Sequence, residues 1–201
     1  MITVADQGAV RIITLDRATK ANALTRAMLI DLRAAFDAPD AKAIILTGAG
    51  GVFSAGADLD AMAAGLGGDP AWEALSSHIA ALPCLTIAAL NGTLAGGAFG
   101  MALACDIRLS VAGAKFFYPV MRLGYLPQPS DPARLSALIG PARAKMILMG
   151  GAKIGADEAL SWGLIDRIAP DDRLLEAATE LASDALAASS AHVAAIKAMI
   201  P

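Results

Sequence analysis

The first half of the chain alternates short apolar runs with amphipathic segments. Apolar runs at 43–47 and 85–90, each bounded by glycine or polar residues, predict buried strands. Residues 9–16 predict another strand, which pairs with 2–5 through a turn at Gln7–Gly8. Strands that alternate with helices along the sequence are typical of an α/β fold.

Apolar residues at helical spacing predict the helices between these strands. Thr25 is expected to cap a helix over 26–36, and Asp69-Pro70 predicts a further helix start. Asp131-Pro132 predicts a start of the same kind, with Asp131 as the N-cap residue, and the chain is expected to be mostly helical from there onward. The remaining expected elements are helices over 58–64 and 96–105 and strands over 107–111 and 116–118.

Composition narrows the class of protein. The chain has 201 residues, of which 56% are hydrophobic, so we expect one domain over residues 1–201 with a sizeable core. The net charge of −3 argues against a nucleic-acid partner. Cys84 and Cys105 lie in apolar runs without metal-ligand spacing, which indicates buried thiols in a cytoplasmic protein and no metal site.

One long uncharged stretch raises the question of a membrane span. Residues 74–105 contain no Lys, Arg, Asp or Glu, but Pro83 and several glycines divide them into short pieces. A spanning helix needs about 20 apolar residues in one continuous element. We therefore expect no membrane span, and the strand-like residues 2–6 predict no secretory signal.

Two glycine-rich junctions carry the candidate chemistry. Residues 47–62, TGAGGVFSAGADLDAM, and 91–106, NGTLAGGAFGMALACD, each read as strand, glycine loop and helix start. Such loops leave backbone N–H groups unpaired, and two of them aimed at one point would stabilise an oxyanion. The G-x-G-x-x-G pattern fails because Phe53 holds its last position, so a dinucleotide oxidoreductase has little support.

Five strings in this order resemble one family of proteins. The chain is similar to the crotonase, or enoyl-CoA hydratase/isomerase, superfamily, which implies a spiral of repeated strand-strand-helix units with a helical C-terminal part. The resemblance also implies further C-terminal helices in relatives, which this chain is expected to lack. The strings are LDRATKANAL (15–24), FSAGADLDAM (53–62), LPCLTIAALNGTLAGGAFGMALACDI (82–107), YPVMRLGYLP (118–127) and IGADEALSWGLIDRI (154–168).

The resemblance implies a substrate and a site. The substrate would be an acyl thioester of coenzyme A, with no separate cofactor, and the oxyanion hole would be the backbone N–H groups of Ala57 and Gly97. Copies would associate as a homotrimer or a hexamer. Substrate-binding positions carried over by the motifs are Lys20, Ala23, Ala55, Asp58, Leu59, Gly96 and Val120.

The chain departs from the family where acids are expected. The two glutamates of hydratases fall at Gly100 and Val120, and an aspartate used by other branches falls at Gln128. None of these residues can transfer a proton, so hydration loses its acid and its base. Isomerase or decarboxylase chemistry is favoured over hydration, and the alternative is an inactive member that binds acyl-CoA or serves in assembly.

Three residues remain as candidate acid–base groups: Asp131, Glu73 and Tyr118. Each has a structural interpretation beside the functional one. Asp131 is expected to cap a helix, Glu73 to lie on a solvated face with Ser76 and Ser77, and Tyr118 to be packed in the core.

Overall fold

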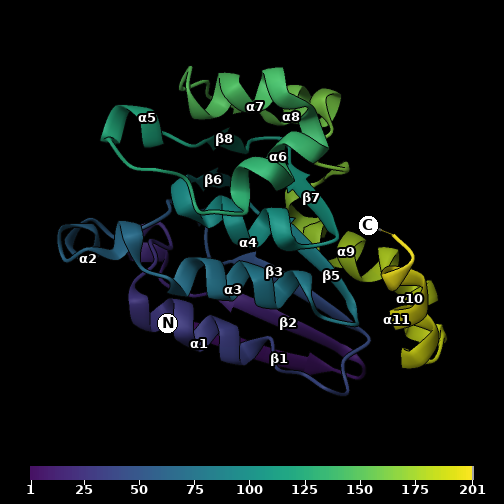
Figure 1. Ribbon diagram of the computed structural model, residues 1–201. Helices are drawn as coiled ribbons and strands as arrows, with labels where there is room; N and C mark the ends of the chain where they lie inside the picture. The colour runs from purple at the N-terminus through teal and green to yellow at the C-terminus, as the bar shows by residue number, and fades with distance from the viewer. Residues whose placement is uncertain (201) are drawn as a thin grey trace.

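The computed structural model describes residues 1–200, which form two β-sheets surrounded by helices (Figure 1). The larger sheet has six strands in the order β1-β2-β3-β5-β7-β10. β1 runs antiparallel to β2, and all other neighbours in this sheet are parallel. Its strands are β1 (Ile2–Gln7), β2 (Val10–Leu15), β3 (Ala43–Gly48), β5 (Leu85–Leu90), β7 (Ile107–Val111) and β10 (Arg167–Ala169).

A smaller sheet collects one short strand after each of three strands of the larger sheet. β4 follows β3, β6 follows β5 and β8 follows β7, and β4, β6 and β8 lie parallel and adjacent. Its strands are β4 (Val52–Ser54), β6 (Thr93–Ala95), β8 (Lys115–Phe117) and the antiparallel β9 (Ile154–Gly155). Repetition of strand, short strand and helix makes the spiral that the resemblance implied, and the α/β prediction is confirmed.

Four of the helices pack side by side beside the larger sheet. α1 contacts α3, α3 contacts α4, and α4 contacts α6, so the helices of successive turns of the spiral form one row (Figure 1). α9 packs against β3, β5 and β7. The α-helices are α1 (Arg26–Ala35), α2 (Leu59–Ala63), α3 (Ala71–Ala80), α4 (Phe99–Ala104), α5 (Val120–Leu123), α6 (Asp131–Ile139), α7 (Pro141–Leu148), α8 (Ala156–Trp162), α9 (Leu174–Leu181), α10 (Ser183–Ala187) and α11 (Ser190–Ala198). Short 3₁₀ turns are η1 (Ala18–Lys20), η2 (Leu66–Gly68), η3 (Gly96–Ala98) and η4 (Asp171–Arg173).

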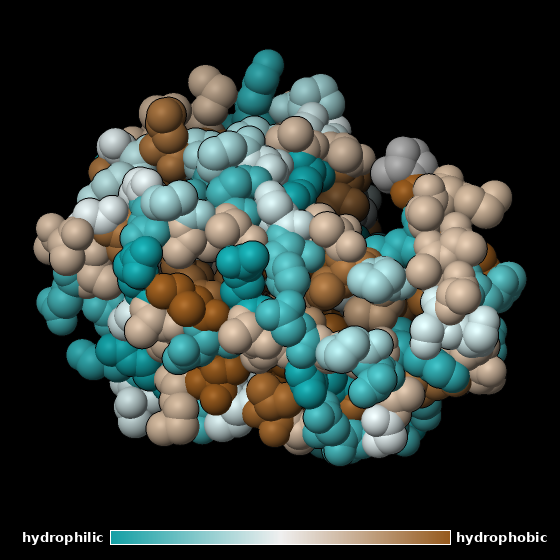
Figure 2. All heavy atoms as spheres, turned by 60° about the horizontal axis from the view of Figure 1, so that its bottom comes forward, coloured by the Kyte–Doolittle hydropathy of each residue, from teal (hydrophilic) through white to brown (hydrophobic). Residues whose placement is uncertain are grey.

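The apolar runs fold as strands because both faces of the larger sheet are covered. The first five residues of β3 are buried, as are the last five of β5, which is the pattern of parallel strands between layers. β1 lies at the sheet edge and is largely exposed. On the face that Figure 2 turns forward, hydrophobic side chains form separate patches among hydrophilic ones. No helix within residues 1–200 is long and apolar enough to cross a membrane.

The expected caps hold at α1 but not at α6. Thr25 accepts a hydrogen bond from the Met28 amide at 3.3 Å, so the predicted cap is confirmed. Asp131 is the first residue of α6 and not its N-cap, which is Ser130, and the Asp131 side chain is fully buried. The prediction of an Asp131 cap was therefore wrong, because this carboxyl group is buried against Gly100 and accepts from the Tyr118 hydroxyl.

The two glycine junctions meet at backbone contact. A Cβ atom added to Gly56, which has a φ of +92°, would lie 2.8 Å from the Ala95 carbonyl oxygen and 3.3 Å from the Gly96 Cα atom. Cβ atoms do not approach a backbone that closely, so only glycine at 56 lets the loop after β4 touch the loop after β6. The residues that follow, Ala57 and Gly97, are thereby held next to one another.

Two asparagines fix the segments that lead into these loops. Asn22 is fully buried, and its Nδ2 donates to the carbonyl oxygens of Ala49 and Val52 at 2.9 and 2.7 Å. Asn91 accepts from the Gly48 amide at 3.0 Å and donates to the Gly50 carbonyl at 2.7 Å. Because both side chains satisfy backbone groups of the first junction, the junction has a defined shape.

We predict that Gly56→Ala destabilises the protein more than Gly8→Ala. Both positions have positive φ, which costs an alanine about 1–2 kcal/mol, but a Cβ at Gly8 meets nothing within 4 Å. Gly56→Ala should lose roughly 1–3 kcal/mol beyond that because the loops must separate. Urea unfolding of both variants measures the difference, and equal losses would contradict the contact.

Candidate active site

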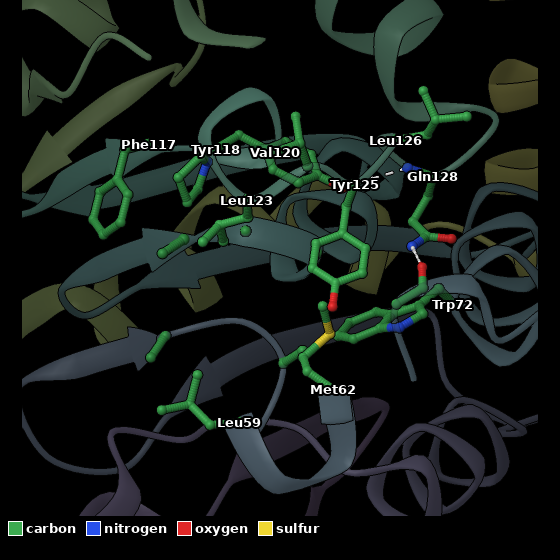
Figure 3. Close-up of a pocket in the computed structure, with 17 residues that line it drawn as sticks. Leu59, Met62, Trp72, Phe117, Tyr118, Val120, Leu123, Tyr125, Leu126 and Gln128 are labelled. Carbon is green, nitrogen blue, oxygen red and sulfur yellow. Dashed lines mark hydrogen bonds between the residues drawn. The ribbon is translucent and has the colours of Figure 1, made fainter. Parts of the chain in front are cut away.

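A pocket lies where the two glycine junctions face the segment between β8 and α6 (Figure 3). It has a volume of about 150 Å³ and opens to solvent. In the part of the chain that the structure describes, no charged side chain lines it. The lining residues are Ala55, Ala57, Leu59, Met62, Gly67, Trp72, Ala95, Gly96, Gly97, Phe117, Tyr118, Pro119, Val120, Leu123, Tyr125, Leu126 and Gln128.

The amide of Ala57 is turned away from the neighbouring chain segment. The Leu24 amide donates to the Gly56 carbonyl oxygen at 2.7 Å, and the Asp58 amide donates to the Leu24 carbonyl oxygen at 2.9 Å. In a trans peptide the C=O and N–H groups point in opposite directions. Since the Gly56 carbonyl points toward Leu24, the Ala57 N–H points to the other side of this bridge.

The same geometry orients the amide of Gly97. The Gly96 carbonyl oxygen accepts from the Phe99 amide within the first turn of η3 and α4. The Gly97 N–H, which belongs to the same peptide unit, therefore points backward, out of the helix start. Among residues 1–200 neither the Ala57 nor the Gly97 amide has a hydrogen-bond acceptor in the turns, loops and caps.

Trp72 sets the wall next to Gly97. Its indole Nε1 donates to the Leu66 carbonyl oxygen at 2.9 Å, which fixes the ring. A Cβ atom at Gly97 would lie 3.2 Å from that ring, so Trp72 and a side chain at 97 compete for the same space. The small residue at 97 therefore serves close packing as well as access to its backbone.

The predicted substrate-binding residues and acid–base candidates divide into two groups. Ala55, Leu59, Gly96 and Val120 line the pocket with Ala57, Gly97 and Tyr118. The residues that do not line it are Lys20, Ala23, Asp58, Glu73 and Asp131.

Asp58 is already engaged in holding the loop. It caps α2 by accepting from the amides of Asp60 and Ala61, and its Oδ2 lies 2.7 Å from Arg17 Nη1. The Arg17 hydrogen bond, together with the amide donors, holds the pKa of Asp58 below its ordinary value. Arg17 also donates to the Ala23 carbonyl oxygen at 2.9 Å, so this cation is paired inside the protein. Lys20 is exposed.

Asp131 lies over Gly100, where the resemblance places a glutamate in hydratases. A Cβ atom at Gly100 would lie 2.9 Å from Asp131 Oδ1, so a side chain there would collide with the carboxyl group. Within residues 1–200 the Asp131 Oδ1 atom has no hydrogen-bond partner, whereas Oδ2 accepts from the Tyr118 hydroxyl at 2.9 Å. The chain thus has an acid near this position, supplied by α6 and not by α4.

Burial dominates the ionisation of this pair. Loss of solvent raises the pKa of Asp131 to about 7, although the Tyr118 hydrogen bond and the positive charge of Arg134 act in the opposite direction. Burial and the neighbouring Asp131 charge raise the pKa of Tyr118 well above its ordinary value. A carboxyl group with a pKa near neutrality can both accept and release a proton under ordinary conditions.

Glu73 ties α3 to the start of α6. Its carboxylate accepts from the Ser130 amide at 3.1 Å, from the Ser130 hydroxyl, and from the Ser77 hydroxyl at 2.7 Å. Burial raises the pKa of Glu73, but these hydrogen bonds outweigh burial and the net pKa is lowered. Ser76 is 1% exposed, so the predicted solvated face was wrong for Ser76, whereas Ser77 is exposed as predicted and Glu73 is partly buried.

Several pocket residues escaped sequence reasoning. Trp72 belongs to the buried stripe of α3, and its ring also forms pocket wall. Met62 of α2 and Phe117 of β8 also line the pocket, and no motif in the sequence marks them as pocket residues. Asn22 does not line the pocket but holds the first junction, and it was detectable in principle because asparagine is a common loop-forming residue.

Comparisons with known proteins identify the family of this chain. The sequence profile of the family described as Enoyl-CoA hydratase/isomerase matches residues 5–200. A carnitinyl-CoA dehydratase of Salmonella typhi is 37% identical over 194 residues, covering 92% of this chain and 74% of that protein. A carnitinyl-CoA dehydratase of Escherichia coli K12 is 36% identical over 199 residues, covering 94% of this chain and 76% of that protein.

Solved structures give the same result. An enoyl-CoA hydratase from Bacillus anthracis superimposes with a TM-score of 0.91 at 31% identity, covering 99% of this chain and 81% of the other. A structure from Geobacillus kaustophilus described as enoyl-CoA hydratase subunit I has a TM-score of 0.89 at 34% identity, covering 98% of this chain and 79% of the other. The chain belongs to the enoyl-CoA hydratase/isomerase family.

Proposed function

We propose that this protein is an acyl-CoA isomerase that holds the thioester carbonyl oxygen between the backbone N–H groups of Ala57 and Gly97. The observation that supports the proposal is that Ala57 and Gly97 lie on touching loops and both line one apolar pocket, and that neither amide has an acceptor in the turns, loops and caps of residues 1–200. Two fixed donors at one oxygen stabilise an enolate more than the neutral thioester, because the negative charge develops on that oxygen.

Hydration receives no support from the pocket wall. Val120 lines the pocket and Gly100 carries no side chain, so the two positions of the hydratase glutamates supply no acid and no base. The relatives named carnitinyl-CoA dehydratases act, by that name, in water elimination, which is the reverse of hydration and needs similar proton transfer. We therefore place isomerisation before hydration for this chain.

The lack of charged side chains among the described residues of the pocket wall favours isomerisation over decarboxylation. A malonyl-type substrate would bring a carboxylate against leucine, methionine, tryptophan and tyrosine side chains, without a cation among the lining residues. Burying an unpaired charge is costly, whereas a neutral alkenyl chain matches this wall. The favoured substrate is thus a neutral unsaturated acyl thioester, with coenzyme A as part of the substrate and no further cofactor.

A second candidate function is acyl-CoA binding without turnover. It is favoured by the same residues, Val120 and Gly100, and by the absence of any charged side chain among the described pocket residues. Self-association as a homotrimer or hexamer stays a prediction. It is supported by large apolar side chains that are exposed beside the pocket, Leu59 at 86% and Leu126 at 85%.

A panel of thioesters distinguishes these functions. We expect conversion of a 3-enoyl-CoA to the 2-enoyl isomer, with much slower hydration of crotonyl-CoA and slower turnover of malonyl-CoA and carnitinyl-CoA. Absorbance of the conjugated thioester follows the isomerisation, and calorimetry measures binding. Binding without turnover across the panel would favour the second function, and hydration as fast as isomerisation would contradict the first.

The apolar wall also predicts a binding preference. Butyryl-CoA should bind at least about tenfold more tightly than malonyl-CoA, a difference of about 1.4 kcal/mol, because only the latter buries a carboxylate. Calorimetric titration of the two thioesters at one ionic strength measures the ratio. Equal affinity, or tighter binding of malonyl-CoA, would show that a cation reaches the acyl group.

A further inference from the structure

Tyr118 connects the pocket to a buried acid. Its ring stacks on Phe99, with centroids 5.4 Å apart and an interplanar angle of 25°, and its side chain lines the pocket. The hydroxyl donates to Asp131 Oδ2 at 2.9 Å and accepts from the Gln128 amide at 3.4 Å, the latter bond being drawn in Figure 3. Gln128 is itself held by a bond from its Nε2 to the Gly67 carbonyl at 3.4 Å. The hydroxyl of this pocket-lining tyrosine is thus held by Asp131 and the Gln128 amide.

Asp131 is buried, and one of its carboxyl oxygens could accept a further hydrogen bond. It is 0% exposed, lies against the bare backbone of Gly100, and has one carboxyl oxygen without a partner within the described residues. Leaving one oxygen of a buried carboxyl group without a hydrogen-bond partner costs free energy, so this arrangement calls for an explanation. Its single strong bond leads to the pocket through Tyr118, so any proton it exchanges with a ligand must pass through that hydroxyl.

We infer that Tyr118 and Asp131 form a proton relay, in which Tyr118 is the catalytic residue at the acyl chain and Asp131 a positioning residue that takes and returns the proton. The relay rests on the proposed enolate chemistry and supplies the proton transfer that Gly100 and Val120 cannot. Asp131 and Tyr118 come from the two ends of the segment that joins β8 to α6, so this segment provides both groups.

The proton transfers balance over one isomerisation. The Cα–H bond breaks, its electron pair forms the enolate, and the proton bonds to the Tyr118 oxygen while the original Tyr118 proton passes to Asp131 Oδ2. In the second step the enolate electrons shift and the Cγ–H bond forms with the proton on Tyr118. Asp131 then returns its proton to Tyr118, and both residues regain their starting state.

The charged groups around Asp131 fit a residue that changes its protonation state. Tyr118 donates a hydrogen bond to Asp131. Arg134 of α6 lowers the pKa of Asp131 and Glu73 of α3 raises it. α4 places no charged group beside the carboxyl group, only Gly100. Burial outweighs these influences and sets the pKa of Asp131 at about 7. Abstraction of the α-proton needs the ionised carboxylate, so kcat should rise with pH through about 7 and then level off.

The test compares Tyr118→Phe and Asp131→Asn with wild type in the isomerisation of a 3-enoyl-CoA. Both variants should lower kcat by about 10²-fold or more. Because Asp131 does not line the pocket, Asp131→Asn should leave KM within about threefold and should abolish the rise of kcat near pH 7. Asp184→Asn, which removes an exposed acid on α10, is the matched control and should keep the wild-type profile.

Each outcome decides between the relay and the proposed function. Loss of kcat and of the pH rise in both relay variants, with acyl-CoA binding intact by calorimetry, supports the relay. If either variant turns over at the wild-type rate, or if kcat of Asp131→Asn still rises near pH 7, the relay is overturned and the proposed isomerase function stands. Wild type that binds the thioester without turnover overturns the relay and favours the binding function, and wild type that binds no thioester overturns the proposed function with it.

Discussion

Backbone contact between two glycine loops is the constraint on which this site depends. Gly56 and Gly96 approach so closely that a Cβ atom at Gly56 would lie 3.3 Å from the Gly96 Cα atom. The spiral brings the loops together because β4 and β6 are adjacent in the smaller sheet. The next peptide in each loop has its carbonyl engaged on one side, so its N–H points to the other. Strand order and the missing side chain of Gly56 thus place the Ala57 and Gly97 amides on adjacent loops.

Much of the fold follows from the sequence, for reasons that particular elements make plain. The runs that became β3 and β5 are mostly apolar, with one threonine each, and Thr25 marks the start of α1. The short strands β4, β6 and β9 have two or three residues, too few for a periodic signal, and they were not expected from the residues alone. The resemblance to the family predicted these strands, because it implies a repeated strand-strand-helix unit whatever the local strand propensity of each segment.

The site was harder to predict than the fold because its acid depends on packing. Asp131 before Pro132 has the pattern of a helix cap, and only the empty space over Gly100 shows why its carboxyl group is buried. Glu73 carried a similar ambiguity and proved to hold the start of α6. A chain without the two expected glutamates thus brings a different acid close to the same helix, a relation that no spacing along the sequence expresses.

Vibrational spectroscopy of the bound thioester carbonyl tests the central claim most directly. An acyl-CoA labelled with carbon-13 at the thioester carbon gives a carbonyl stretch that can be isolated by difference between labelled and unlabelled complexes. Two amides at one oxygen should polarise the C=O bond and move this stretch to lower frequency than in water. A carbonyl stretch in the complex that equals its value in solution would show that the Ala57 and Gly97 amides do not bind this oxygen.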